Sequence, residues 1–79
     1  MKAIEDRIID VLATQLKLAP DGIEPDMTFE SLDIDSLVIV ELGLLLDGVF
    51  DIAIDDGELT NEMTIRDAAR LVETKQAVA

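Results

Sequence analysis

DIDSLVIVELGLLLDGVF, residues 33–50, is the stretch that decides the fold. A short acidic lead brings Ser36 to the start of an apolar segment that is long enough for one helix. Placing residues 36–50 on a helix separates two faces, of which the more apolar one is typical of a protein core. The residues on that core face are Val38, Ile39, Leu42, Leu45, Leu46, Val49 and Phe50.

The opposite face of this predicted helix mixes apolar side chains with carboxylates. It consists of Ser36, Leu37, Val40, Glu41, Leu44, Asp47 and Gly48. Apolar side chains that face water, ringed by charge and next to a hydroxyl, are typical of a surface where another protein docks. The pattern alone leaves open the alternative that another helix covers this face.

Ser36 has no evident partner for catalysis. A serine nucleophile needs a neighbouring base, and a chain without His or Cys excludes Ser-His-Asp and Cys-His mechanisms. Composition does not dismiss a Ser-Lys pair. The simplest structural alternative is that Ser36 caps the helix N-terminus, although Asp35 could serve as that cap equally well.

Seventy-nine residues predict one domain, residues 1–79, whose stability comes from aliphatic packing. About half of the residues are hydrophobic, and Phe29 and Phe50 are the only aromatic ones. The lack of Cys and His excludes disulfides and makes a zinc or haem site unexpected. The aspartates do not have the glycine and glutamate spacing of an EF-hand loop, so we expect no metal site.

The formal net charge of −12 is unevenly distributed. No Lys or Arg lies between Leu18 and Ile65, a stretch that holds most of the acidic residues. Such a field repels nucleic acid and anionic membranes and attracts basic protein surfaces, although solubility alone is a sufficient reason for it. We therefore expect protein partners with positively charged docking surfaces and no binding to nucleic acid or membrane.

No targeting segment or membrane span is visible in the sequence. Acidic residues enter the first turn, unlike in a signal peptide, and the run from Leu37 to Phe50 is shorter than the roughly 20 residues that span a bilayer. These features favour a soluble cytoplasmic protein, with an organelle precursor that has lost its leader left open.

Outside the central stretch, the pattern predicts two further main helices. Apolar residues repeat every three or four positions over 3–18, and Pro20, Gly22 and Pro25 then hold the chain in a long loop. We expect Phe29 of this loop to insert between the helices, and Thr28 or Ser31 to cap a brief turn. The last helix begins at Thr64.

Residues 52–54 are predicted to be an extended connector and residues 55–61 a single helical turn. Thr64 and Asp67 approach a capping box at the start of the last helix. Its inner stripe is Ile65, Ala68, Ala69 and Val72. The predicted fold class is therefore all-α: a small four-helix bundle, with three main helices plus one short helix, and a long loop between helices one and two.

These residues resemble the acyl carrier proteins. The similarity consists of Asp35-Ser36-Leu37 at the head of a helix followed by Val40-Glu41-Leu42, in a chain of the family's size. The acidic loop with prolines before Ser36 and the Thr-Ile-Arg-Asp-Ala-Ala run at 64–69 are also similar, so the resemblance covers nearly the whole chain.

The resemblance implies that Ser36 is the attachment site of 4′-phosphopantetheine, which a phosphopantetheinyl transferase adds from coenzyme A. The thiol of that arm would carry acyl groups as thioesters, so the protein would be a carrier and not an enzyme. We also expect it to be a monomer. Its partners would be the transferase and an acyltransferase, ketosynthase or acyl-activating enzyme. The residues expected to bind partners are Asp35, Leu37, Val40, Glu41, Leu44 and Asp47.

The sequence also departs from the fatty-acid version of this family. Asp33 replaces a typical glycine, Val38 replaces an acid, and Gly48 occupies a position that is often acidic. We therefore expect a polyketide or other specialised pathway in preference to fatty-acid synthesis. Two alternatives remain: an aminoacyl (peptidyl-type) carrier, against which Asp35 counts, and an acidic helical adaptor without a prosthetic group.

Overall fold

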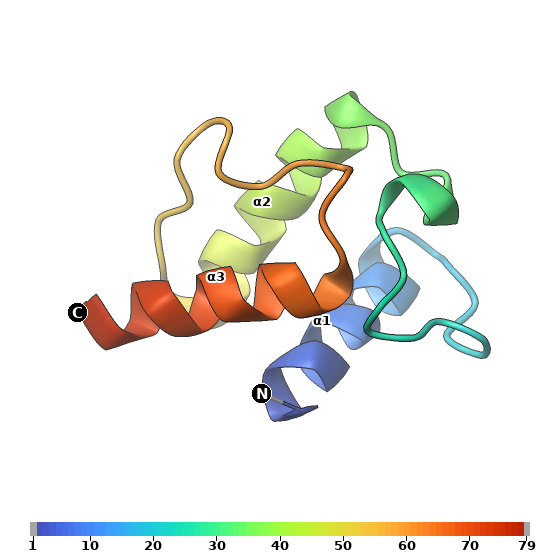
Figure 1. Cartoon of the computed structure of the whole chain (residues 1–79), viewed down its shortest axis with the longest axis horizontal. Coiled ribbons are helices and arrows are strands. Elements are labelled where there is room, and N and C mark those ends of the chain that lie inside the picture. Colours follow the sequence, from blue (N-terminus) through green and yellow to red (C-terminus); the bar gives the residue numbers. More distant parts are fainter. Residues whose placement is uncertain (1, 79) are drawn as a thin grey trace.

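The structure is a computed structural model that describes residues 2–78. Its elements are α1 (Lys2–Gln15), the 3₁₀ helix η1 (Glu30–Leu32), α2 (Ser36–Phe50) and α3 (Ile65–Val78). Helix α1 packs against both α2 and α3, and long connections join α1 to α2 and α2 to α3 (Figure 1). The all-α fold class predicted from the sequence is confirmed.

The core is aliphatic, with one aromatic side chain at its centre. Phe29 has no exposed surface, as expected for a loop residue inserted between helices. Phe50, predicted for the core face, is only half-buried and packs against the core, as does Ile54 of the connector. The core residues without exposed surface are Ile8, Leu12, Phe29, Leu42, Leu46, Ile65, Ala68, Ala69 and Val72.

Helix α1 ends at Gln15, three residues before the predicted Leu18. Lys17 adopts a left-handed conformation, with φ of 60°, and the Leu18 N–H donates to the Leu12 carbonyl at 3.2 Å. The chain thus turns back over the last turn of α1. A left-handed residue that is not glycine is uncommon, so this end was not readable from the sequence.

The long loop after α1 is anchored by hydrogen bonds to the loop before α3. The Phe29 N–H donates to the Met63 carbonyl at 3.0 Å, and the Glu30 N–H donates to that of Asn61 at 2.8 Å. In the reverse direction, the Ile65 N–H donates to the Met27 carbonyl at 3.1 Å. Buried backbone groups need such partners, and these bonds provide them without a sheet.

The brief turn expected near Thr28 and Ser31 is formed by η1 together with the residues just before it. The Ser31 N–H donates to Thr28 Oγ1 at 3.1 Å, and the Ser31 hydroxyl donates to the Thr28 carbonyl at 2.7 Å. Both hydroxyls therefore take part in local hydrogen bonds. The short helical element of this protein consequently precedes α2.

The single helical turn predicted at residues 55–61 is wrong, because this segment contains non-helical turns and no helix. Gly57 has φ of 86°, which is incompatible with a helix, and the Asp55 N–H donates to Glu58 Oε1 at 2.8 Å. The same carboxylate oxygen lies 2.7 Å from Lys75 Nζ on α3. This bond holds the pKa of Glu58 below its usual range and raises that of Lys75.

The start of α3 has the predicted capping box. The Asp67 N–H donates to Thr64 Oγ1 at 3.0 Å, and the Thr64 N–H donates to Asp67 Oδ2 at 3.1 Å. The bond from the Thr64 backbone holds the pKa of Asp67 below its usual range. Nearby, the largely buried Glu5 of α1 pairs with Arg66 Nε at 3.4 Å, so α3 is joined to α1 by charge as well as packing.

The capping box predicts a pH dependence. A carboxylate whose pKa is lowered by folding stabilises the protein above its unfolded pKa, and this contribution is lost as the pH falls through the folded value. Asp67→Asn should therefore lower the free energy of unfolding at pH 7, and the deficit relative to the wild type should shrink as the pH falls below about 4 and vanish only below the lowered pKa of the folded protein. Urea unfolding of both proteins across this pH range measures the difference. A deficit that is constant with pH would contradict the assignment.

Candidate functional site

The chain that leads into α2 is held tightly on both sides of a sharp turn. Asp33 adopts a left-handed conformation, with φ of 63°, and its N–H donates to the Glu30 carbonyl at 3.0 Å. Ile34, which follows, is buried and donates its N–H to the Phe29 carbonyl. Asp is one of the few residues other than Gly that tolerate this conformation. The path of the chain therefore fixes where α2 begins.

Asp35 is the N-cap of α2. Its Oδ1 accepts hydrogen bonds from the backbone N–H groups of Leu37 at 3.1 Å and Val38 at 2.9 Å. Of the two capping candidates in the sequence, the carboxylate takes the cap, and Ser36 becomes the first helical residue with an exposed side chain. The hydroxyl is thus presented to solvent at the positive end of a helix.

The outward face of α2 is uncovered in the described part of the chain. Leu37 is 80% exposed, Val40 58% and Leu44 68%, and Glu41 is exposed beside them. No helix of residues 2–78 covers these side chains, which answers the alternative that the sequence left open. Val49, predicted for the core, is instead 36% exposed, so the buried face of α2 is narrower than its pattern indicated.

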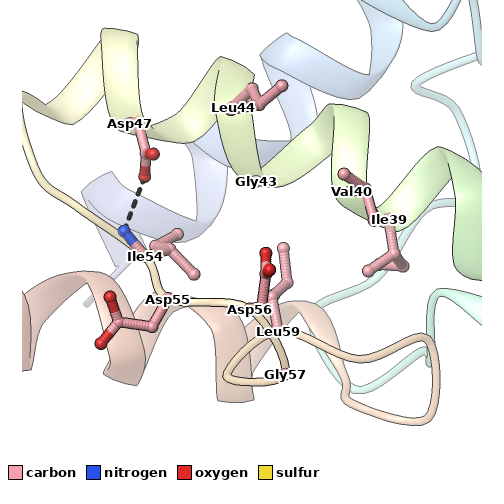
Figure 2. A pocket seen from close by; sticks show the side chains of 10 residues that line it. All are labelled: Ile39, Val40, Gly43, Leu44, Asp47, Ile54, Asp55, Asp56, Gly57 and Leu59. Atoms are coloured by element: carbon pink, nitrogen blue, oxygen red, sulfur yellow. Dashed lines mark hydrogen bonds between the residues drawn. The ribbon is translucent and has the colours of Figure 1, made fainter.

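Asp47 has a structural contact that the sequence did not reveal. It was expected to point outward, but it is half-buried, and its Oδ1 accepts a hydrogen bond from the Ile54 N–H at 2.9 Å (Figure 2). The carboxylate therefore fixes the connector after α2 against the helix. This contact joins residues seven positions apart across a turn, which no periodic pattern predicts.

A small hollow separates α2 from the connector. Its volume is about 70 Å³, and Figure 2 shows the side chains around it. The side chains that α2 contributes belong largely to the face predicted to bind partners. The sequence did not indicate the side chains that the connector contributes, because this segment has no regular apolar pattern. The lining residues are Ile39, Val40, Gly43, Leu44 and Asp47 on α2, and Ile54, Asp55, Asp56, Gly57 and Leu59 on the connector.

The connector is also anchored to α3. Lys75 Nζ lies 2.7 Å from Glu58 Oε1 and 3.9 Å from Asp55 Oδ2, so one cation binds two acids of the turn. Within residues 2–78, no group of three or more acidic side chains is placed to hold a metal ion, and no helix is long and apolar enough to cross a membrane.

The site thus offers one exposed hydroxyl, a rigid helix start and an exposed apolar face with acids around it. The chain has no His that could activate the hydroxyl, and the adjacent Asp35 carboxylate is taken up by the helix cap. The arrangement can instead bear a covalently attached group and present it to another protein. This combination favours a carrier over a catalyst.

Comparisons with known proteins agree with this interpretation. The family model described as a phosphopantetheine attachment site matches residues 6–72. An acyl carrier protein of Sulfurovum is 38% identical over 72 residues, which cover 90% of this chain and 96% of that protein. Acyl carrier proteins of Wolinella succinogenes and Bdellovibrio bacteriovorus are 37% and 34% identical, covering 94% and 92% of this chain and 99% and 95% of theirs.

The N-cap predicts a cost for changing Asp35. Asp35→Ala should lower the free energy of unfolding by about 1 kcal/mol, because two N–H groups at the start of α2 lose their acceptor. Asp35→Asn should lower it less, since the amide oxygen can accept the same bonds. Urea unfolding followed by far-ultraviolet circular dichroism measures both, and equal stability of Asp35→Ala and the wild type would rule out the cap.

Proposed function

The chain belongs to the acyl carrier proteins, whose cofactor is 4′-phosphopantetheine, and on this premise we propose that Ser36 carries the arm. The observation that carries this proposal is the exposure of Ser36 as the first residue of α2, with Asp35 in the capping position. The chain has two serines, and the hydroxyl of the other, Ser31, donates to the Thr28 carbonyl. Ser36 is therefore the better placed of the two.

The residues around Ser36 fit a phosphodiester. The N-terminal end of a helix stabilises negative charge, and the first turn of α2 contains no acidic side chain to repel it. Asp35 adds one negative charge at the cap, but its Oδ1 faces the backbone of Leu37 and Val38. The thiol of the bound arm supplies the thioester linkage to the acyl cargo, and the protein itself positions the arm.

The exposed face of α2 is the proposed docking surface. As a carrier, the protein interacts with a phosphopantetheinyl transferase and with the enzymes of its pathway. We place that contact on Asp35, Leu37, Val40, Glu41, Leu44 and Asp47. The supporting observations are the exposed apolar side chains next to Ser36 and the acidic charge around them, which favours partners with basic surfaces.

The pathway proposed is polyketide or other specialised biosynthesis, in a monomeric cytoplasmic carrier made of one domain, residues 1–79. The support is the left-handed Asp33, at a position where the fatty-acid version has glycine, and the half-buried Val38 in place of an acid. An aminoacyl carrier is the second candidate. The family match argues against the adaptor without a prosthetic group.

Attachment is tested by intact mass after incubation with coenzyme A and a broad-specificity phosphopantetheinyl transferase. Wild type and Ser31→Ala should each gain one phosphopantetheinyl group, and Ser36→Ala should gain none. The free energy of unfolding of Ser36→Ala should stay within about 0.5 kcal/mol of the wild-type value. The Ser31 variant is the matched control, because it removes the only other serine hydroxyl. Loading of Ser36→Ala would show that the attachment site lies elsewhere.

Docking is tested by the rate of the same reaction. Leu37→Ala should lower kcat/KM for loading about fivefold or more, which corresponds to an interface hot spot of about 1 kcal/mol. Its free energy of unfolding should stay unchanged, because Leu37 is 80% exposed. Val49→Ala, on the other side of α2, is the control and should load at the wild-type rate. Equal rates for both variants would place the docking surface elsewhere.

A further inference from the structure

Three of the four glycines of the chain directly follow an aspartate, in the pairs Asp21-Gly22, Asp47-Gly48 and Asp56-Gly57. Such a pair can rearrange without an enzyme, because glycine has no side chain to shield its backbone nitrogen from the neighbouring carboxyl group. In a folded protein, the reaction depends on the freedom of that nitrogen and of the backbone around it. The structure places the three pairs in two different environments.

The first and third pairs are the central residues of two β-turns, at residues 20–23 and 55–58. Each turn is closed by a hydrogen bond from its last N–H to its first carbonyl, of 3.2 Å and 3.1 Å respectively. Gly22 and Gly57 have φ of 88° and 86°, whereas neither of the aspartates before them has a positive φ. This combination defines type II turns, in which the third residue needs the conformational freedom of glycine.

Both turns expose the groups that would react. The aspartate and the glycine of each pair are exposed, and Figure 2 shows Gly57 at the bend of the connector. Within residues 2–78, the N–H groups of Gly22 and Gly57 have no hydrogen-bond acceptor. The space around both glycines is also open, since a Cβ there would meet nothing within 4 Å. The nitrogen and the carboxyl group are therefore free to approach each other once the backbone rotates.

The pair Asp47-Gly48 is held in place. Both residues belong to α2, in which the Gly48 N–H donates to the carbonyl four residues before it. The Asp47 Oδ1 also accepts the Ile54 N–H at 2.9 Å. Attack by the Gly48 nitrogen would require the end of α2 to unfold, so the helix protects this pair.

The two turns differ in how firmly they are closed. In the described part of the chain, the turn at 20–23 has its closing hydrogen bond and no other polar contact. The turn at 55–58 has in addition the bond from the Asp55 N–H to Glu58 Oε1, at 2.8 Å, and the ion pair of that oxygen with Lys75 Nζ, at 2.7 Å. In a type II turn ψ of the second residue is about 120°, and ring closure requires rotation away from that value, so the turn has to open. The turn at 20–23 opens more easily.

We propose that Asp21 and Asp56 are sites of spontaneous conversion to isoaspartate, and that Asp47 is not. At each site the glycine nitrogen attacks the aspartate Cγ, its proton leaves with the carboxyl hydroxyl as water, and a five-membered succinimide closes. Water then opens the ring at either carbonyl and gives aspartate or isoaspartate, so the mass of the protein is unchanged overall. This reaction is independent of attachment at Ser36.

The product defines a partner and a consequence. Isoaspartate carries a free α-carboxylate, which is the group that an isoaspartyl methyltransferase methylates with S-adenosylmethionine. It also lengthens the main chain by one methylene. At Asp56 this change falls in the turn that Lys75 joins to α3, in the wall of the hollow beside the exposed face of α2. Conversion of Asp21 leaves that wall unchanged.

The test is ageing of the whole wild-type chain at neutral pH and physiological temperature, in water enriched in oxygen-18. Each ring opening places one oxygen from water in the residue. Electron-transfer fragmentation of peptides cut after glutamate shows which residue gained it and which became isoaspartate. Methyl transfer from labelled S-adenosylmethionine by an isoaspartyl methyltransferase measures the total.

Four variants serve as controls. Asp21→Glu and Asp56→Glu keep the charge but would have to close a six-membered ring, which is slower, so each should lose the signal at its own position alone. Lys75→Met removes the ion pair with Glu58 and keeps the aliphatic stem. Lys2→Met, at an exposed position of α1, is the matched control for that change.

The expected result is isoaspartate at Asp21 and Asp56, faster at Asp21, and none at Asp47 over the same period. Lys75→Met should raise the rate at Asp56 about threefold or more and leave Asp21 unchanged, because the turn at 55–58 loses a bond that opposes its opening. In guanidinium chloride all three residues should convert at similar rates.

Three outcomes would overturn the assignment: no conversion at Asp21 and Asp56, conversion of Asp47 as fast as theirs in the folded protein, or a slow Asp47 in the unfolded chain. The last would trace the selectivity to the local sequence and not to the helix. An unchanged rate at Asp56 in Lys75→Met would overturn the protection by the ion pair.

Discussion

The insertion of Phe29 into the core is the contact on which the rest of the structure depends. A chain of 79 residues without disulfides has to stabilise a long loop by packing. Phe29 belongs to that loop, has no exposed surface, and lies in the core that the three helices share. The backbone of Phe29 also holds the loop in place. Its N–H donates to the Met63 carbonyl, and its own carbonyl accepts hydrogen bonds from the N–H groups of Leu32 and Ile34. Because Ile34 immediately precedes the cap of α2, the position of Ser36 follows from the burial of one aromatic ring.

The connector after α2 is fixed differently, by charge. Asp47 holds it at one end through the Ile54 N–H, and Lys75 holds its turn through Glu58. Both are partly buried single polar contacts, each of which contributes only modestly to stability. Their effect is geometric, because together they keep the connector at a distance from α2 that leaves a hollow and not a packed interface.

Sequence patterns predicted the segments that have a regular apolar periodicity and the helix starts that have capping residues. The periodicity of α2 and α3, the capping box of Thr64 and Asp67, and the burial of Phe29 all follow from local rules. The end of α1 and the turn at 55–61 did not, because Lys17 adopts a left-handed conformation that is uncommon outside glycine, and the bond of Glu58 to Lys75 is a tertiary contact. For the site, the sequence indicated Ser36 and the exposed face. It could not indicate the hollow, whose second wall comes from a segment without periodicity.

The side chains proposed for function are mostly those that the fold does not need. Ser36, Leu37 and Val40 are exposed, and none of them belongs to the core cluster. Changes at these positions should therefore alter attachment or docking at little cost in stability, since surface substitutions are usually close to neutral. Asp47 is the exception, because its carboxylate both faces the hollow and holds the connector. A substitution at Asp47 would therefore change the docking surface and release the connector together, whereas a substitution at Leu37 changes the docking surface alone.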